Sequence, residues 1–267
     1  MNISVIIGLI LAFGSLISGY ILEQGHISAL FLLSPFIIVF GGTWGAVILS
    51  NNLSDILLAF KSLLASFTTN IGKAPELIIT KIVSIADLCR QSGLLKLEEV
   101  LNDSELSRDD YLILKEGIVL TLEGKSTDEM RNVLDADIHA FTVQKQQEIT
   151  VFTGAGGFSP TLGIIGTVMG LIHVLGNMTD TESLTASIST AFIATLYGVV
   201  FANLLYIPAA NRLKSYLKRQ QILKEIMAEG ICLIAKGESS RNIVNKLSLY
   251  YQAFAGQEKK YKEGVTN

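Results

Sequence analysis

The distribution of charged residues along the chain constrains its fold more than any other feature. Four stretches of at least 20 residues contain no Asp, Glu, Lys or Arg: 3–22, 30–50, 149–179 and 183–211. Because about 20 apolar helical residues cross the hydrocarbon core of a bilayer, each stretch predicts one transmembrane helix. The third and fourth stretches are longer than a bilayer requires, so we expect their helices to tilt or to project into the cytoplasm.

The basic residues predict the topology of the chain. All 21 Lys and Arg lie in the segments 51–148 and 212–267, whereas the short connections 23–29 and 178–183 have none. Basic residues near span ends remain on the cytoplasmic side, so both basic segments and both termini are expected to be cytoplasmic. The prediction is an all-α membrane protein in four parts: helices one and two in 1–50, a helical cytoplasmic domain in 51–148, helices three and four in 149–211, and a cytoplasmic C-terminal helix and tail in 212–267.

Composition and motifs exclude several classes of function. Hydrophobic residues make up 49% of the chain and charged residues only 17%, which is low for a soluble domain. The net charge of −3 and the lack of a basic stripe argue against a nucleic-acid partner. The three histidines and two cysteines are scattered, and no phosphate-binding loop is present. We therefore expect no metal site, no cofactor and no enzymatic activity.

Local signals predict helices in the segment between the second and third spans. Pro75 opens an apolar pattern of helical period, and Gly93 is a plausible end for that helix. Ser126 and Glu129 have the spacing of a capping box. A long helix is therefore predicted to start just after Ser126 and to continue into span three. The segment 101–110 is polar and is expected to form a turn region.

The spans contain hydroxyls and prolines but no ionisable carrier. Since no span carries Asp, Glu, Lys or Arg, any moving ion needs a charged group from another protein chain. Thr167 in span three and Thr195 in span four can bond to backbone carbonyls or line a wet path. Pro160 and Pro208, in the cytoplasmic parts of the same spans, each free a carbonyl and bend the helix. A single threonine is more simply a backbone partner, but the combination on adjacent spans favours an ion pathway.

Three stretches resemble the flagellar motor stator family that includes MotA and PomA. Span three resembles it through the run Ser159–His173, which reads SPTLGIIGTVMGLIH, and span four through Ala194–Pro208. The stretch Arg90–Glu98 resembles the family's rotor-facing segment. The resemblance covers nearly the whole chain, and the run in span three is its most specific part.

The resemblance implies a partner and a mechanism. Family members form a homo-oligomeric ring, thought to be a pentamer, around a dimer of a B subunit (MotB or PomB) in the inner membrane. The B subunit carries the membrane Asp that binds the ion, and ion flow turns the ring against the rotor protein FliG. By position, the resemblance implies six site residues. Pro160 and Pro208 match the functional prolines, Thr195 matches the threonine that faces the partner's Asp, and Thr167 matches a threonine linked to ion choice. Arg90 and Glu98 match the charges that engage the rotor.

The ion and the exact family remain open to alternatives. Thr167 together with Thr195 resembles sodium-type members, whereas the run 168–173 is more similar to proton-type members, so a proton is expected. The energiser family of TonB and Tol systems resembles stators in spans three and four. Its members have only one span before the cytoplasmic block, and two spans here disfavour it. A membrane scaffold would not need the two threonines and two prolines together, and no motif supports a membrane enzyme.

Overall fold

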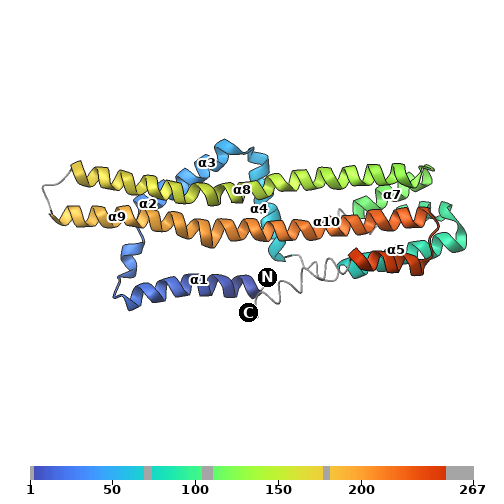
Figure 1. Ribbon diagram of the computed structural model, residues 1–267, viewed down its shortest axis with the longest axis horizontal. Coiled ribbons are helices and arrows are strands. Elements are labelled where there is room, and N and C mark those ends of the chain that lie inside the picture. The colour runs from blue at the N-terminus through green and yellow to red at the C-terminus, as the bar shows by residue number, and fades with distance from the viewer. Residues whose placement is uncertain (1–2, 69–73, 104–110, 177–180, 251–267) are drawn as a thin grey trace. The chain divides into compact units, whose positions relative to one another are not determined.

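The computed structural model describes residues 3–68, 74–103, 111–176 and 181–250, and these ranges contain helices and no strand (Figure 1). The all-helical fold class, with a helical region between spans two and three, is therefore confirmed. The chain forms two compact units, one of residues 1–69 and 146–214 and one of residues 70–145 and 215–267. Four helical segments are long and apolar enough to cross a membrane: Val5–Leu22, Ile27–Ser50, Thr127–Gly176 and Ser187–Ala235.

The first unit begins with the first two predicted spans. Helix α1 (Ile3–Leu22) has the bounds of the first predicted span, and none of its described side chains is buried. Span two is a succession of short helical segments rather than one uniform helix. These are a 3₁₀ turn η1 (Ile27–Leu30), helix α2 (Leu33–Phe36), a π-helical turn η2 (Ile37–Gly41) and helix α3 (Gly42–Ser50), after which α4 (Leu53–Thr68) follows.

The first unit also contains the pair of helices that forms spans three and four. Helix α8 (Thr127–Gly176) enters this unit at residue 146, and α9 (Thr181–Val200) returns beside its last part in the opposite direction (Figure 1). A second π-helical turn, η6 (Phe201–Tyr206), joins α9 to α10 (Ile207–Ala235). The positions at which the membrane surfaces cross these helices stay predictions. The predicted boundaries of the four parts depend on them and stay predictions too.

The second unit is a helical domain with its own apolar core. It consists of the first part of α8, the last part of α10, a helix over 240–250, and α5 (Ala74–Ser92), η3 (Leu94–Lys96), α6 (Leu97–Leu101) and α7 (Leu112–Leu122). Burying large apolar side chains is the main favourable contribution to such a fold. The largest fully buried side chains of this unit are Ile82, Leu97, Ile113, Leu114, Ile118, Met130, Leu134, Ile226 and Met227.

Several local signals in the sequence are confirmed in this unit. The backbone N–H of Ser126 donates to Glu129 Oε2 at 2.9 Å, and the N–H of Glu129 donates to Ser126 Oγ at 3.3 Å. This reciprocal capping box starts α8 at Thr127, and the helix continues without a break into span three, as predicted. Helix α5 begins at Ala74, beside Pro75, and it ends before Gly93. Of the predicted polar turn 101–110, residues 104–110 lie outside the described residues.

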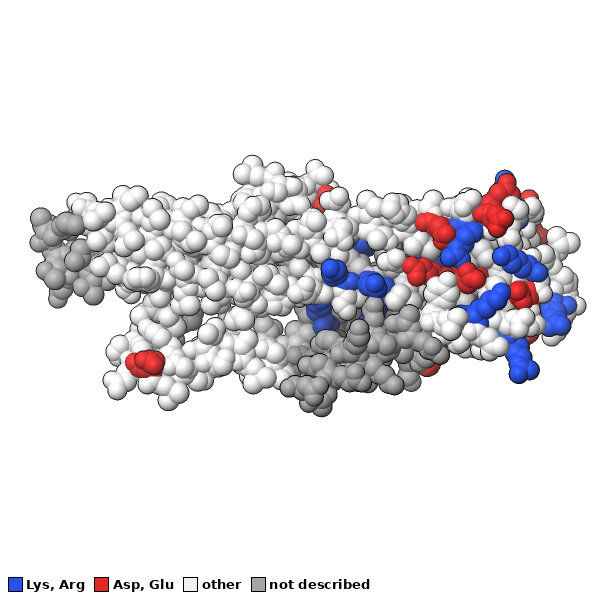
Figure 2. All heavy atoms as spheres, viewed as in Figure 1, with Lys and Arg blue, Asp and Glu red and all other residues white. Residues whose placement is uncertain are grey.

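Charged side chains are distributed very unevenly between the units. On the face drawn in Figure 2, Lys, Arg, Asp and Glu gather mainly over the helices of the second unit. The helices of the first unit present large exposed apolar side chains instead, for example Ile10, Leu11, Ile164 and Ile172. An aqueous surface seldom presents so continuous an apolar face, so the first unit has the surface of a membrane-embedded bundle.

Candidate functional site

Small residues bring spans three and four into backbone contact. A β-carbon built on Gly163 of α8 would lie 2.9 Å from the carbonyl oxygen of Ala194, and one built on Gly170 would lie 2.8 Å from the β-carbon of Ala191. Real β-carbons essentially never approach other atoms so closely. The glycines on α8 therefore allow α9 to approach more closely than any larger residue would, as small residues do in membrane helix pairs.

This close approach brings together the two threonines that the sequence singled out. Thr167 Oγ1 and Thr195 Oγ1 lie 2.5 Å apart across the two spans. Thr167 Oγ1 also donates to the carbonyl oxygen of Ala191 on α9 at 2.8 Å, and it lies 3.1 Å from the carbonyl oxygen of Gly163 on its own helix. A hydroxyl has a single proton. If Thr167 donates to a carbonyl, Thr195 must therefore be the donor between the two hydroxyls.

The threonine pair forms a small polar site inside an otherwise apolar wall. Both side chains are half-buried, so the cluster of hydroxyl and carbonyl oxygens is partly open to a neighbouring surface. Such oxygens can accept from a protonated carboxyl group or replace water around a cation. The two interpretations of these threonines are therefore compatible, because Thr167 satisfies backbone carbonyls and also presents a hydroxyl pair. The sequence reasoning did not include the carbonyl of Ala191, which depends on the pairing of the helices.

Pro160 lies one helical turn from Gly163 and packs directly on span four. It remains inside α8, although its ring nitrogen cannot donate to the carbonyl of Gly156. A β-carbon built on Gly198 would lie 3.2 Å from the α-carbon of Pro160 and 2.7 Å from the carbonyl oxygen of Ser159. The buried Ser159 hydroxyl donates to the carbonyl oxygen of Gly198 at 3.0 Å. Ser159 was not predicted as a site residue, and it links the proline turn to span four.

Pro208 lies in a different setting from Pro160. It is exposed, and it is the second residue of α10, immediately after the π-helical turn Phe201–Tyr206. A proline inside an α-helix removes one backbone hydrogen bond and crowds the carbonyl four residues earlier. The wider π turn before Pro208 changes that local geometry, and such turns are frequent at functional sites. Pro208 thus follows an irregular turn of its span, whereas Pro160 lies within a continuous α-helix.

Tyr197 is a site residue that the sequence reasoning missed. Its hydroxyl donates to the carbonyl oxygen of Leu30 and accepts from the backbone N–H of Leu32 at 3.0 Å. Its ring stacks on Phe201 and meets the edge of Phe36, with centroid distances of 5.7 and 6.5 Å. Tyr197 therefore ties span four to the start of span two. A tyrosine in an apolar run gives no signal of this kind, because its partners are backbone atoms far away in sequence.

The two predicted rotor-binding charges flank a turn in the second unit. Arg90 is near the C-terminal end of α5, Glu98 is in α6, and both side chains are exposed. Gly93 ends α5 with a φ of 84°, so the two residues belong to different helices. They therefore do not share the face of one helix.

The hydrogen bonds around this turn distinguish Arg90 and Glu98 from their charged neighbours. Lys96 pairs with Glu99, Lys81 pairs with Asp103, and Asp87 accepts from Ser240. Among the described residues from 81 to 103, only the side chains of Arg90 and Glu98 are charged and have no hydrogen bond or ion pair with the described chain. Two opposite charges are therefore left available to a partner at one turn.

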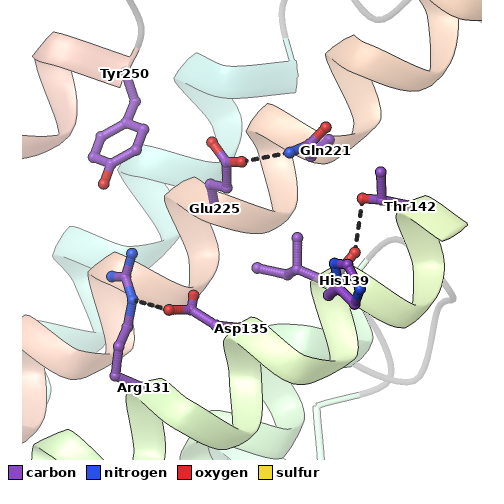
Figure 3. A pocket seen from close by; sticks show the side chains of 8 residues that line it. Arg131, Asp135, His139, Thr142, Gln221, Glu225 and Tyr250 are labelled. Atoms are coloured by element: carbon purple, nitrogen blue, oxygen red, sulfur yellow. Dashed lines mark hydrogen bonds and ion pairs between the residues drawn. The ribbon is translucent and has the colours of Figure 1, made fainter.

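A second polar feature of the same unit is a pocket of about 300 Å³ between α8, α10 and Tyr250 (Figure 3). Arg131 in this pocket pairs with Asp135 at 3.0 Å and also with Glu229. Gln221 donates to Glu225 at 2.9 Å. The charges that line it are largely satisfied by one another, and no group of His, Cys, Asp and Glu suited to a metal is present among the described residues. The pocket is best explained as structural.

Comparison with known proteins agrees with this arrangement. Residues 107–226 match the MotA/TolQ/ExbB proton channel family, and residues 6–93 match the motility protein A N-terminal family. Motility protein A of Bacillus subtilis (strain 168) is 33% identical over 253 residues, which are 95% of this chain and 92% of that protein. The flagellar MotAB stator complex from Bacillus subtilis has a chain similar to this one at a TM-score of 0.82 and 33% identity, covering 95% of this chain and 97% of that one.

A second solved structure, that of C. jejuni MotAB, is similar at a TM-score of 0.84 and 28% identity, covering 94% of this chain and 96% of that one. The match at 6–93 includes both spans that precede the second unit. That region distinguished a stator protein from an energiser in the sequence reasoning. The resemblance seen in spans three and four thus extends over the full architecture, and the chain belongs to the motility protein A family.

Proposed function

We propose that this chain is the MotA-type component of a flagellar motor stator, which together with a B subunit forms an ion channel that drives the rotor. The observation that carries the proposal is the pair Thr167–Thr195, held between spans three and four by glycine contacts. The relatives in solved MotAB complexes support a partner of the B type. A channel family also supports the expectation that the chain is not itself an enzyme.

The ion carrier is proposed to be the membrane Asp of the B subunit. Neither 149–176 nor 187–211 contains an Asp, Glu, Lys or Arg, so these parts of spans three and four supply no charged carrier. Binding an ion would neutralise the partner's Asp and lower the cost of moving it past apolar walls. Thr195 and Thr167 would then offer hydroxyls to the neutralised Asp, and the ion would leave near Pro160 and Pro208.

The ring assembly is proposed from the surface of span three. Large apolar side chains on α8, including Ile164, Ile165, Val168 and Ile172, are at least half exposed in the single chain. A homo-oligomer, proposed to be a pentamer around a dimer of the B subunit, would cover part of this surface, and lipid would cover the rest. The chain is proposed to be a multi-pass inner-membrane protein with both termini in the cytoplasm, which the location of its basic residues supports.

The principal test is a deletion strain that lacks every other stator gene. Cells without the chain should build filaments but should neither swim nor rotate when tethered, and the wild-type gene should restore both. Normal swimming in this strain would refute the proposal and favour an energiser role. In the complemented strain, Thr195→Leu should abolish torque while the stator complex still assembles. Thr195→Val is the matched control, because it keeps the size of threonine and so separates loss of the hydroxyl from added bulk. Unchanged swimming with Thr195→Leu would remove its assigned role.

Rotor engagement is proposed to run through Arg90 and Glu98 to FliG. The unpaired state of these two charges among the described residues supports this role, since no contact within that part of the chain accounts for them. Arg90→Glu should weaken torque without reducing ion flux, and Lys96→Glu is the control because Lys96 already pairs with Glu99. Loss of flux with Arg90→Glu would contradict the assignment.

The translocated ion is proposed to be a proton. The match to a family described as a proton channel family supports this choice, although that family also contains energisers. Swimming speed in the complemented strain should be unchanged when sodium is replaced by potassium at constant pH. A swimming speed that decreases as the sodium concentration is lowered would instead favour sodium. The threonine oxygens would then replace part of its hydration shell.

A further inference from the structure

The turn between α5 and α6 presents two leucines between the unpaired charges. The side chain of Leu95 is 80% exposed and that of Leu94 is 42% exposed, whereas Leu97, two residues further on, is fully buried. The turn is held by backbone hydrogen bonds from Gly93 N–H to the carbonyl of Cys89 at 2.8 Å and from Lys96 N–H to the carbonyl of Gly93 at 3.2 Å. Leu95 is therefore exposed on a turn whose backbone is held by hydrogen bonds.

The surroundings of this turn are open on the described chain. A β-carbon built on Gly93 would meet no atom within 4 Å, and the positive φ of Gly93 directs the chain out of α5. Leu97 anchors the turn in the apolar core, so Leu94 and Leu95 stand outside that core. Single exposed leucines are common on protein surfaces and need no explanation. Adjacent leucines at a fixed turn, with one unpaired charge on each side, form a more specific pattern.

We propose that Leu94 and Leu95 are the apolar centre of the rotor contact and that Arg90 and Glu98 are its charged rim. The proposal rests on the proposed function, because it takes the rotor protein as the partner. The partner of this contact is a surface of the rotor protein that carries an apolar side chain between two charged groups. An acidic group faces Arg90 and a basic group faces Glu98. Stable interfaces combine a desolvated apolar centre with a polar rim in this way.

The physical reason is that two exposed ion pairs alone make a weak contact. Exposed pairs contribute little, and salt screens them over about 10 Å at 0.1 M and about 3 Å at 1 M. Burying an exposed leucine side chain against a partner contributes far more than one such pair, and salt does not screen it. The charges would set the register and the rate of approach, while the leucines would hold the contact under load.

The experiment measures binding of the purified stator complex in nanodiscs to the purified rotor protein. Leu95→Ser should weaken binding about tenfold, as expected for loss of one buried leucine side chain. Leu77→Ser is the matched control, because Leu77 is 64% exposed in the first turn of α5, at the opposite end of that helix from the turn that carries Leu95. Circular dichroism of both variants should equal that of the wild type, since neither side chain is buried.

Ionic strength and tethered-cell torque supply the second readout. Wild-type binding should persist at 1 M salt, binding by Leu95→Ser should be lost there, and the same variant should stall at high load in tethered cells. The proposed apolar centre would be overturned if Leu95→Ser kept wild-type affinity and torque while Arg90→Glu lost rotor binding in the same assay. That result would leave the proposed function intact. No rotor binding by the wild type, with normal swimming of the deletion strain, would overturn both.

Discussion

Replacing Gly163 by alanine tests whether backbone contact between spans three and four organises the threonine pair. The added β-carbon would lie 2.9 Å from the carbonyl oxygen of Ala194, against 3.4 Å for an ordinary van der Waals contact. The helices must then separate by about 0.5 Å, and forced expansion of a packed core costs about 1–3 kcal/mol. The hydrogen bond from Thr167 to the carbonyl of Ala191, now 2.8 Å, would lengthen toward about 3.3 Å, beyond the usual range for two oxygens.

The measurement compares Gly163→Ala with Gly157→Ala on the same helix. A β-carbon built on Gly157 meets nothing within 4 Å, so this control changes helix propensity without changing the packing and should stabilise slightly, by about 0.5–1 kcal/mol. Thermal unfolding of the detergent-solubilised stator complex should place Gly163→Ala below the wild type and Gly157→Ala at or above it. Ion flux should fall only with Gly163→Ala. Equal melting temperatures and equal flux for the two variants would refute the reasoning.

Three further predictions concern single contacts. Ser126→Ala should destabilise the second unit by about 1 kcal/mol, because α8 loses its N-cap, and chemical denaturation followed by circular dichroism checks this. Tyr197→Phe should destabilise the stator complex by about 1–3 kcal/mol, measured as a lower melting temperature, because the carbonyl of Leu30 and the N–H of Leu32 lose their partner. Hydrogen bonds from Asn242 and Lys246 lower the pKa of Glu238 below its ordinary value. Its stabilising contribution is therefore complete above that ordinary pKa and is lost as pH falls through the lowered one. Circular dichroism should therefore show a small loss of thermal stability at acid pH in the wild type, and a smaller loss in Glu238→Gln.

The sequence predicted the parts of the fold that depend on local chemistry. Long uncharged runs identified the spans because a bilayer excludes charge, and α1 has the predicted bounds. The pair Ser126 and Glu129 predicted the start of α8 because a capping box is formed by residues three apart. Gly93 predicted the end of α5 because its positive φ suits glycine best.

The sequence could not predict features that depend on which helices pack together. The contact of Thr167 with Ala191, and the link between Ser159 and Gly198, both require the pairing of α8 with α9. Tyr197 gave no signal, since its partners are backbone atoms 165 or more residues away. The π-helical turns were missed because an extra residue in a turn leaves the apolar pattern of a fully apolar span unchanged.

The π-helical turn Phe201–Tyr206 gives span four one place where the length of the chain can vary. An α-helix turns by about 100° per residue, so an insertion or deletion rotates everything beyond it onto another face. A π turn already holds one extra residue between two α-helical parts. Loss of one residue there would leave Thr195 and α10 on their present faces, whereas the same loss elsewhere in the span would rotate one of them away. Single-residue length differences between this chain and its relatives are therefore expected to fall in this turn.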